Sequence, residues 1–360
     1  MSSSSHRRFA VRVAIALGLT LLAVTIGWIT FVTLHVLLLL FAAIVLGVFL
    51  ASNAHWISHW TKMSYRASLA AQLIVLTASF IAAGALLVDP ISQQIAALSE
   101  KLPESLARVE GWARQYEIGD RLLDRMMNPS QMMEDGVNVI QPARSALSGM
   151  TSVVLGLAIF LFIAIYLAAS PELYRIGILK LVPIAHRPRA AEVLGRVGYV
   201  LLWWTYGKLL EMALVGGLTF IGLWLLGVPL AMTLALLAAL MAFVPNFGPV
   251  IALIPAVLLA LLQGPATAGW VVVLYIGIQT LESYLVTPLV QQRTVELPPV
   301  LTIMAQLMLA LLAGFLGLAT ATPLVAALLS VVQMLYVNDV LGDGTVEPQE
   351  QEKSVGIDQA

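Results

Sequence analysis

One acidic side chain of the sequence lies within an otherwise apolar segment. Glu282 belongs to Tyr275-Ile-Gly-Ile-Gln-Thr-Leu-Glu-Ser-Tyr284, and Gln279 precedes it by three residues, which places both side chains on one face of a helix. A carboxylate in the middle of a bilayer costs about 3 kcal/mol, so it usually faces a cavity or a partner and marks an ion, proton or substrate path. We predict such a path for Glu282 and Gln279. The alternative is a carboxylate near the inner headgroups, paired with Arg293.

A second candidate site combines an amide side chain with an interrupted backbone. In Val244-Pro-Asn-Phe-Gly-Pro249, Asn246 lies between two prolines and close to a glycine. Proline has no N–H and interrupts a helix, so neighbouring backbone groups lose their helical partners. Asn246 could therefore bind a polar solute, or it could cap the end of a helix.

Other motifs point away from metal, cofactor and enzyme chemistry. His55 and His59 have the i, i+4 spacing of a metal pair, yet no acidic or thiol ligand lies close by. Lys208 and Glu211 are three residues apart and are predicted to form an ion pair at the membrane interface. The sequence has no cysteine, and it has no Walker loop, GxSxG elbow, HExxH motif or dinucleotide fingerprint. We therefore expect no metal, no cofactor and no enzymatic activity.

The composition is typical of a membrane protein. Hydrophobic residues make up 60% of the 360 residues and charged residues only 11%, whereas roughly a quarter of an ordinary soluble domain is charged. The formal net charge of -1 provides no large basic surface for phosphates, so a nucleic-acid partner is not expected. Apolar runs recur along most of the chain. We predict an all-α polytopic membrane protein whose partner is the lipid bilayer.

The first apolar run predicts paired helices. No charged residue occurs in Val13–Leu50, and its 38 residues exceed the roughly 20 that cross a bilayer once. We predict two spans joined by a turn near Thr30 to His35, then a third span over about 67–88 and a fourth over 151–169. A cleaved signal peptide is disfavoured, because its apolar core has only about 7–15 residues.

The placement of charge predicts the orientation. Basic residues in segments 7–12, 62–66 and 175–208 alternate consistently as cytoplasmic under the positive-inside rule. Segment 89–150 has nine acidic and six basic residues, and we expect it outside the cytoplasm as a small helical module. This module could be a cap on the membrane domain or on a neighbouring subunit, or it could gate a substrate. Both termini are then cytoplasmic, and the acidic tail after Asn338 is expected to be disordered.

The C-terminal half contains an apolar pair that is too short for two ordinary spans. Segment 209–337 carries only four charged residues, and proline or glycine divides it into pieces. The stretches between Pro229 and Pro245 and between Pro249 and Gly264 have about 15 residues each, against the roughly 20 that a span needs. We predict that they form a broken or re-entrant hairpin.

A second interrupted hairpin is expected from 300 to 337, with its bend at Gly314, Gly317 and Pro323. Interrupted helices near the midplane are typical of secondary transporters, and non-helical backbone at that depth must face protein or a water-filled cavity. Kinks in ordinary spans are the alternative. The predicted layout is three spans over 1–88, the outer module over 89–150, span four over 151–169, cytoplasmic interfacial amphipathic helices over 170–208, the membrane core over 209–338 and the tail over 339–360.

Four motifs follow one another in the C-terminal half. They are Leu181-Val-Pro183 before an arginine-rich helix, Val244-Pro-Asn-Phe-Gly-Pro249 before Ile254-Pro255, Gln279-Thr-Leu-Glu-Ser-Tyr-Leu-Val-Thr-Pro288, and the bend from Gly314 to Pro323. With these motifs and its N-terminal layout, the chain resembles the autoinducer-2 exporter family of bacterial membrane permeases. One departure is Pro298 before Pro299, where relatives often have a polar residue or histidine before the proline.

The resemblance implies about eight spans with two broken or re-entrant hairpins, and a homo-oligomer such as a pentamer in the bacterial inner membrane. It implies export of a quorum-sensing furanone or another small hydrophilic compound, and some relatives are associated with exchange of sodium or lithium for protons. The motif match places seven residues near the transport path: Pro245, Asn246, Gly248, Pro249, Gln279, Glu282 and Pro288.

Three hypotheses for the function follow. The first is a permease of the autoinducer-2 exporter type that moves a small polar solute, with Glu282 coupling transport or shaping the site. The second is a sodium(lithium)/proton antiporter, for which Glu282 would be indispensable and flux would follow the proton gradient. The third is a non-transporting membrane scaffold, which predicts a dry, well-packed interior around Asn246 and Glu282.

Overall fold

The computed structural model describes residues 3–79, 81–82, 140–291 and 297–342. Every regular element within these ranges is a helix, and no strand occurs there. The predicted outer module, 89–150, lies outside the described residues as far as residue 139, and its residues 140–150 are helical. The third span beyond residue 82 and the tail from 343 onward also lie outside the described residues. Four described helices, or five if one bent pair counts as a span, are long and apolar enough to cross a bilayer. The count of about eight spans stays a prediction.

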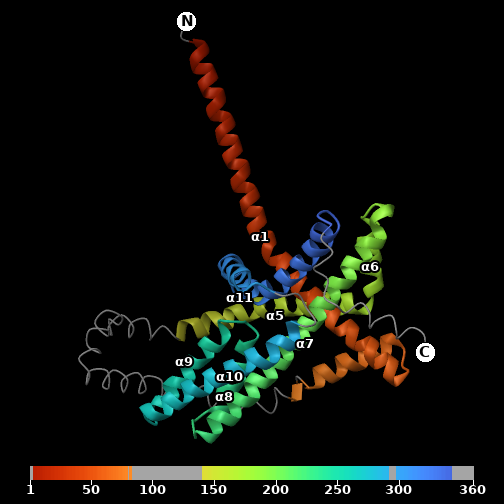
Figure 1. Ribbon diagram of the computed structural model, residues 1–360. Helices are drawn as coiled ribbons and strands as arrows, with labels where there is room; N and C mark the ends of the chain where they lie inside the picture. The colour runs from red at the N-terminus through yellow and green to blue at the C-terminus, as the bar shows by residue number, and fades with distance from the viewer. Residues whose placement is uncertain (1–2, 80, 83–139, 292–296, 343–360) are drawn as a thin grey trace.

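The first helix, α1 (Ser3–Thr61), is one unbroken element of 59 residues. The predicted turn near Thr30 to His35 is therefore wrong. Residues 28–46 contain neither glycine nor proline, so no residue there interrupts the helical hydrogen bonds. At 1.5 Å per residue the helix is about 88 Å long, and its N-terminal part projects away from the other helices (Figure 1). The part that meets the length and hydropathy of a membrane span is Thr33–Thr61.

A sharp bend separates α5 (Ile140–Ala169) from α6 (Pro171–Lys180), and the angle between the two helices is 84°. Pro171 occupies the first turn of α6, where its missing N–H needs no partner, and the same residue cannot continue α5. The side chain of Ser170 makes no capping hydrogen bond, so proline rather than the serine hydroxyl accounts for the break.

A long helix follows the short helix η2 (Ile184–His186). This helix, α7 (Arg187–Leu225), has 39 residues and begins with proline in its first turn. The segment predicted to be interfacial, 170–208, comprises α6, η2 and the first half of α7, and α7 continues without a break into its apolar second half. One rigid helix therefore joins the arginine-rich segment to the membrane core.

The membrane core is built from short and long helices. They are α8 (Ala231–Ala242), α9 (Gly248–Leu261), α10 (Pro265–Gln291), α11 (Pro299–Val332) and the π-helix η3 (Gln333–Asn338). Helices α7 to α10 pack around one apolar cluster, in which Leu223, Leu234, Leu259 and Val271 are buried. Helix α1 packs against α5, α7 and α11, and it lies close enough to α5 for a Cβ at Gly47 to be 3.2 Å from the carbonyl oxygen of Ala164.

The outer faces of these helices expose large apolar side chains. Trp224 on α7, Trp270 on α10 and Leu311 on α11 are among them, and Leu311 is 87% exposed. Soluble monomers rarely expose contiguous apolar patches beyond a few hundred Å². In a bilayer the same surface contacts lipid tails, and the helical backbone satisfies its own hydrogen bonds. The described helices therefore present a lipid-facing surface.

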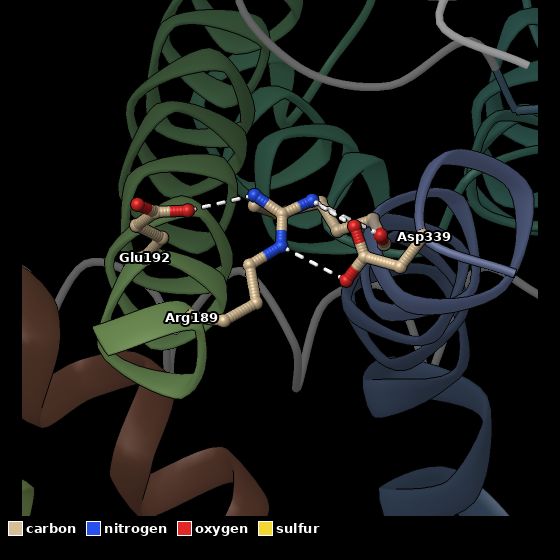
Figure 2. Close-up of polar contacts among 4 residues, drawn as sticks. Arg189, Glu192 and Asp339 are labelled. Atoms are coloured by element: carbon tan, nitrogen blue, oxygen red, sulfur yellow. Dashed lines mark hydrogen bonds and ion pairs between the residues drawn. The ribbon is translucent and has the colours of Figure 1, made fainter. Parts of the chain in front are cut away.

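The first turn of α7 is tied to the end of η3 by Arg189, as Figure 2 shows. Nε and Nη2 of Arg189 donate to the two carboxylate oxygens of Asp339 at 3.0 and 2.9 Å. Nη1 of Arg189 donates to Oε2 of Glu192 at 2.7 Å. Nη2 also donates to the carbonyl oxygen of Met334 at 3.1 Å. This paired geometry matches a guanidinium to a carboxylate. We call Arg189, Glu192 and Asp339 the arginine clasp.

Candidate functional site

The bend between α8 and α9, residues 243–247, is shaped by residue types that the sequence singled out. Asn246 has φ = 67°, a left-handed conformation that asparagine adopts more readily than most residues. At Gly248 an added Cβ would lie 1.8 Å from the carbonyl oxygen of Met241, so only glycine fits there. Pro249 lies in the first turn of α9. The bend is therefore folded tightly against the last turns of α8.

Helix α11 is also interrupted. Gly314 has φ = 61° and ψ = -140°, which are not helical values. At Gly317 an added Cβ would lie 2.0 Å from the carbonyl oxygen of Leu309, so the backbone on the two sides of Gly314 is in close contact. Pro323 is fully buried within the second arm. We call residues 299–313 and 315–332 the first and second arms of α11.

A hydrogen bond shows that the two arms lie side by side. Gln306 of the first arm donates through Nε2 to the hydroxyl oxygen of Thr322 of the second arm at 3.2 Å. Sixteen residues of straight helix would separate the two positions by about 24 Å. The chain must therefore turn back at Gly314, and the arms form a helical hairpin.

The same glutamine joins this hairpin to the α8–α9 bend. Gln306 accepts a hydrogen bond from Nδ2 of Asn246 at 3.3 Å and donates through Nε2 to the carbonyl oxygen of Pro245 at 3.4 Å. Its side chain is fully buried. We call Asn246, Gln306, Thr322 and the Pro245 carbonyl group the amide cluster. It places polar, uncharged groups where two interrupted helices meet.

A second polar cluster contains charged side chains and touches the end of α8. Nζ of Lys208 is 2.6 Å from Oε2 of Glu211 and donates to the carbonyl oxygen of Ala242 at 3.3 Å, at the end of α8. The ion pair predicted from the spacing is present, and it is buried within the protein. Ala242 and Pro245 are only three residues apart, so the end of α8 and the bend that follows it each supply a carbonyl group to one cluster.

Glu282 and Gln279 approach this ion pair from α10. Nε2 of Gln279 donates to Oε2 of Glu282, as their shared helix face predicts. The carboxylate of Glu282 is half-buried, and its helix α10 packs against α7, which carries Lys208 and Glu211. We call Lys208, Glu211, Gln279 and Glu282 the charged cluster.

The remaining candidates are Pro288, Arg293 and the histidines of α1. Pro288 lies inside α10, and Arg293, the alternative partner of Glu282, lies outside the described residues. Nδ1 of His55 is 3.0 Å from the carbonyl oxygen of Ala51, and the His55 ring packs on that of Tyr65. In the described ranges no three histidine, cysteine, aspartate or glutamate side chains group together as metal ligands.

Sequence reasoning did not identify Gln306 or Thr322. Gln306 is a polar residue within the apolar run of α11, as Glu282 is within α10. An uncharged amide is a weaker indicator of a functional site than a carboxylate in such a run. The partners of Gln306 lie 60 and 16 residues away along the chain. Only the turn at Gly314 and the bend at Asn246 bring them together.

The described helices expose apolar side chains and enclose polar clusters where helices are interrupted. Together with the candidate spans, these features define a multi-pass α-helical membrane protein. The chain belongs to the AI-2E transporter family, because residues 7–336 match the family described as AI-2E family transporter. Membership of this family places the protein in a lipid bilayer and indicates a small solute.

Three relatives share the name "Putative transport protein", with the suffixes YueF, YrrI and MT0215. YueF of Bacillus subtilis (strain 168) is 24% identical over 263 residues, which cover 69% of this chain and 70% of YueF. MT0215 of Mycobacterium tuberculosis (strain CDC 1551 / Oshkosh) is 30% identical over 291 residues, 75% of this chain and 76% of the relative. YrrI of Bacillus subtilis (strain 168) is 27% identical over 206 residues, 57% of this chain and 58% of YrrI.

Proposed function

We propose that this protein is a permease that moves a small polar solute across the bacterial inner membrane, with the quorum-sensing signal autoinducer 2 as the first solute to test. The observation that carries the proposal is the fully buried Gln306, which links Asn246, the Pro245 carbonyl group and Thr322. Interrupted helices supply solute sites in secondary transporters, because their freed backbone groups can hydrogen-bond a polar molecule.

The lengths of α8 and α9 support a re-entrant hairpin. They have 12 and 14 residues, or about 18 and 21 Å, whereas the hydrocarbon core is about 30 Å thick. A pair of this length enters the membrane and returns to the same side, so its bend lies at depth. That placement puts the amide cluster within the bilayer, where Pro245, Asn246, Gly248 and Pro249 line the path of the solute.

The orientation and assembly in this proposal come from charge and resemblance. The basic segments at 7–12 and 175–208 favour cytoplasmic termini in a multi-pass inner-membrane protein. The family resemblance favours a homo-oligomer such as a pentamer. The protein acts as a permease rather than an enzyme and uses no cofactor.

A flux measurement tests the proposal. Purified protein in liposomes is compared with protein-free liposomes for uptake of autoinducer 2 and of Na⁺ and Li⁺, under an imposed pH gradient. Protein-dependent uptake of autoinducer 2 supports the permease. The Glu282→Gln variant shows whether the carboxylate couples flux to protons, and Glu172→Gln is the matched control because Glu172 is an exposed glutamate on α6.

The charged cluster favours a second candidate, a sodium(lithium)/proton antiporter. It contains two carboxylates, those of Glu211 and Glu282, on helices α7 and α10, which pack against each other. Carboxylates inside a membrane protein commonly mark the path of a proton or a monovalent cation. Cation flux that follows the pH gradient and is lost in Glu282→Gln would favour the antiporter. Folded protein that moves neither the furanone nor a cation would favour the scaffold.

A further inference from the structure

Gln306 makes contacts that no other described side chain of α11 makes. Its amide binds the first interrupted element through Asn246 and Pro245 and the second arm of its own helix through Thr322. The three donor–acceptor distances are 3.2–3.4 Å, longer than the roughly 2.9 Å of a typical N–H···O bond. All three groups of the Gln306 amide interaction therefore have a hydrogen-bond partner.

The segments that Gln306 joins meet at two interruptions of helical structure. Asn246 and Gly314 both have left-handed backbone conformations at the points where helical structure stops. Around Gly317 the two arms approach each other closely, with the backbone of Leu309 and the Ala313 side chain as neighbours. Directional bonds between the two arms and the bend come from the amide cluster.

A buried amide in this position has a defined cost when its partners leave. An unpaired polar group away from water disfavours the separated state by about 5- to 150-fold, so the arms and the bend separate readily only when another polar molecule takes over the bonds. Water or a transported solute can do so, while lipid cannot.

We propose that Gln306 is a positioning residue of the transport site, which holds the two arms of α11 and the α8–α9 bend in a closed arrangement until a polar molecule replaces its hydrogen bonds. The role in transport rests on the proposed permease function. The hydrogen-bond latch itself is a property of the folded protein and can be measured without any transported solute.

The test is a distance measurement by pulsed electron paramagnetic resonance. The chain has no cysteine, so cysteines introduced at Met308 and Leu328 label only the two arms. Met308 lies on the first arm and Leu328 on the second, and their side chains are 58% and 56% exposed. Both positions face away from the amide cluster, so the labels do not remove the bonds under study.

The doubly labelled parent protein, diluted with an excess of unlabelled protein so that label pairs between subunits are rare, is expected to give one dominant distance. Gln306→Met keeps the length of the side chain but removes its donor and acceptor, and Thr322→Val removes the hydroxyl group at nearly constant volume. Loss of one hydrogen bond shifts a two-state equilibrium about five-fold, so both variants should populate a second, longer distance. Thr322→Ser keeps the hydroxyl group and should retain the parent distance.

Gln333→Met is the matched control, because Gln333 lies on η3 outside the amide cluster. An unchanged distance distribution in Gln306→Met overturns the latch. If Gln306→Met does not yield folded protein, the comparison of Thr322→Val with Thr322→Ser decides the question by the same criterion. Liposomes without flux contradict the permease function alone, because the distance measurement needs no solute.

Discussion

Lys208 and Glu211 form an ion pair in the interior of the protein, with 2.6 Å between Nζ and Oε2 and side chains that are 7% and 14% exposed. Lys208 also binds the carbonyl oxygen of Ala242, where α8 ends. A buried ion pair contributes little net stability relative to apolar residues of the same volume, but removing one partner leaves the other charge unpaired. Lys208 therefore links α7 to the C-terminal end of α8.

The first prediction concerns this pair. Lys208→Met should lower the free energy of unfolding by about 3–5 kcal/mol, because Glu211 is left buried without its cation. The double variant Lys208→Met/Glu211→Gln should recover most of the loss. Chemical unfolding in detergent measures both values. Arg175→Met is the control, since its pair with Glu172 is exposed and should contribute at most about 1 kcal/mol. Equal losses for Lys208→Met and Arg175→Met would refute the buried pair.

The second prediction concerns the arginine clasp. Arg189→Lys keeps the positive charge but loses the two parallel donors that bind Asp339. Because the clasp is partly exposed, the expected loss is about 1 kcal/mol, or about five-fold in the local opening equilibrium. Hydrogen exchange of the amides in η3 measures it. Arg196→Lys is the control, because the Arg196 guanidinium lies over the ring of Tyr199 in the same helix. Unchanged exchange in Arg189→Lys would contradict the role of the clasp.

The third prediction concerns the α8–α9 bend. In Gly248→Ala the new Cβ would meet the carbonyl oxygen of Met241, which belongs to rigid backbone and cannot move aside alone. We expect a loss of about 1–3 kcal/mol from overpacking and a matching drop in the yield of monodisperse protein. Gly217→Ala, where nothing lies within 4 Å of the new atom, is the control. A thermal midpoint of Gly248→Ala equal to that of the control would show that the bend is looser than described.

The fourth prediction concerns the turn of the α11 hairpin. Gly314 has a left-handed conformation with space around it, so Gly314→Ala introduces backbone strain without a clash. Left-handed conformations cost a residue with a Cβ about 1 kcal/mol. Gly177→Ala in α6 also has open space but no such conformation, and there alanine should be neutral or stabilising. Thermal unfolding of the two variants compares them, and a Gly314→Ala variant as stable as Gly177→Ala would contradict the turn.

Local sequence features predicted much of the fold class. A long apolar run without charge crosses lipid as a helix, because lipid offers the backbone no hydrogen-bond partner. In a helix each N–H group bonds the carbonyl group four residues earlier in the same segment. Proline and glycine act locally too, and the structure has interruptions at Asn246 and Gly314 within the segments marked by those residues. The turn predicted near residues 30–35 was wrong for the same local reason. The apolar run is long enough for two spans, but it has no proline or glycine there to end the helix.

The site was only partly predictable. Gln279 and Glu282 share a helix face, and Lys208 and Glu211 do as well, so spacing along the chain was enough to pair them. The position of the Lys208–Glu211 pair on α7 relative to the Gln279–Glu282 pair on α10 depends on how these two helices pack. The partners of Gln306 depend on the turn at Gly314, which no local pattern connects to Asn246.

The sequence by itself determined that this protein is a helical membrane protein of the AI-2E transporter family, because hydropathy and ordered motifs are properties of neighbouring residues. The tertiary structure alone decided that Gln306 holds two interrupted helices together and that Lys208 binds the end of α8. Hydrogen bonds between distant segments form only where the packing of the helices places donors and acceptors within about 3 Å of one another.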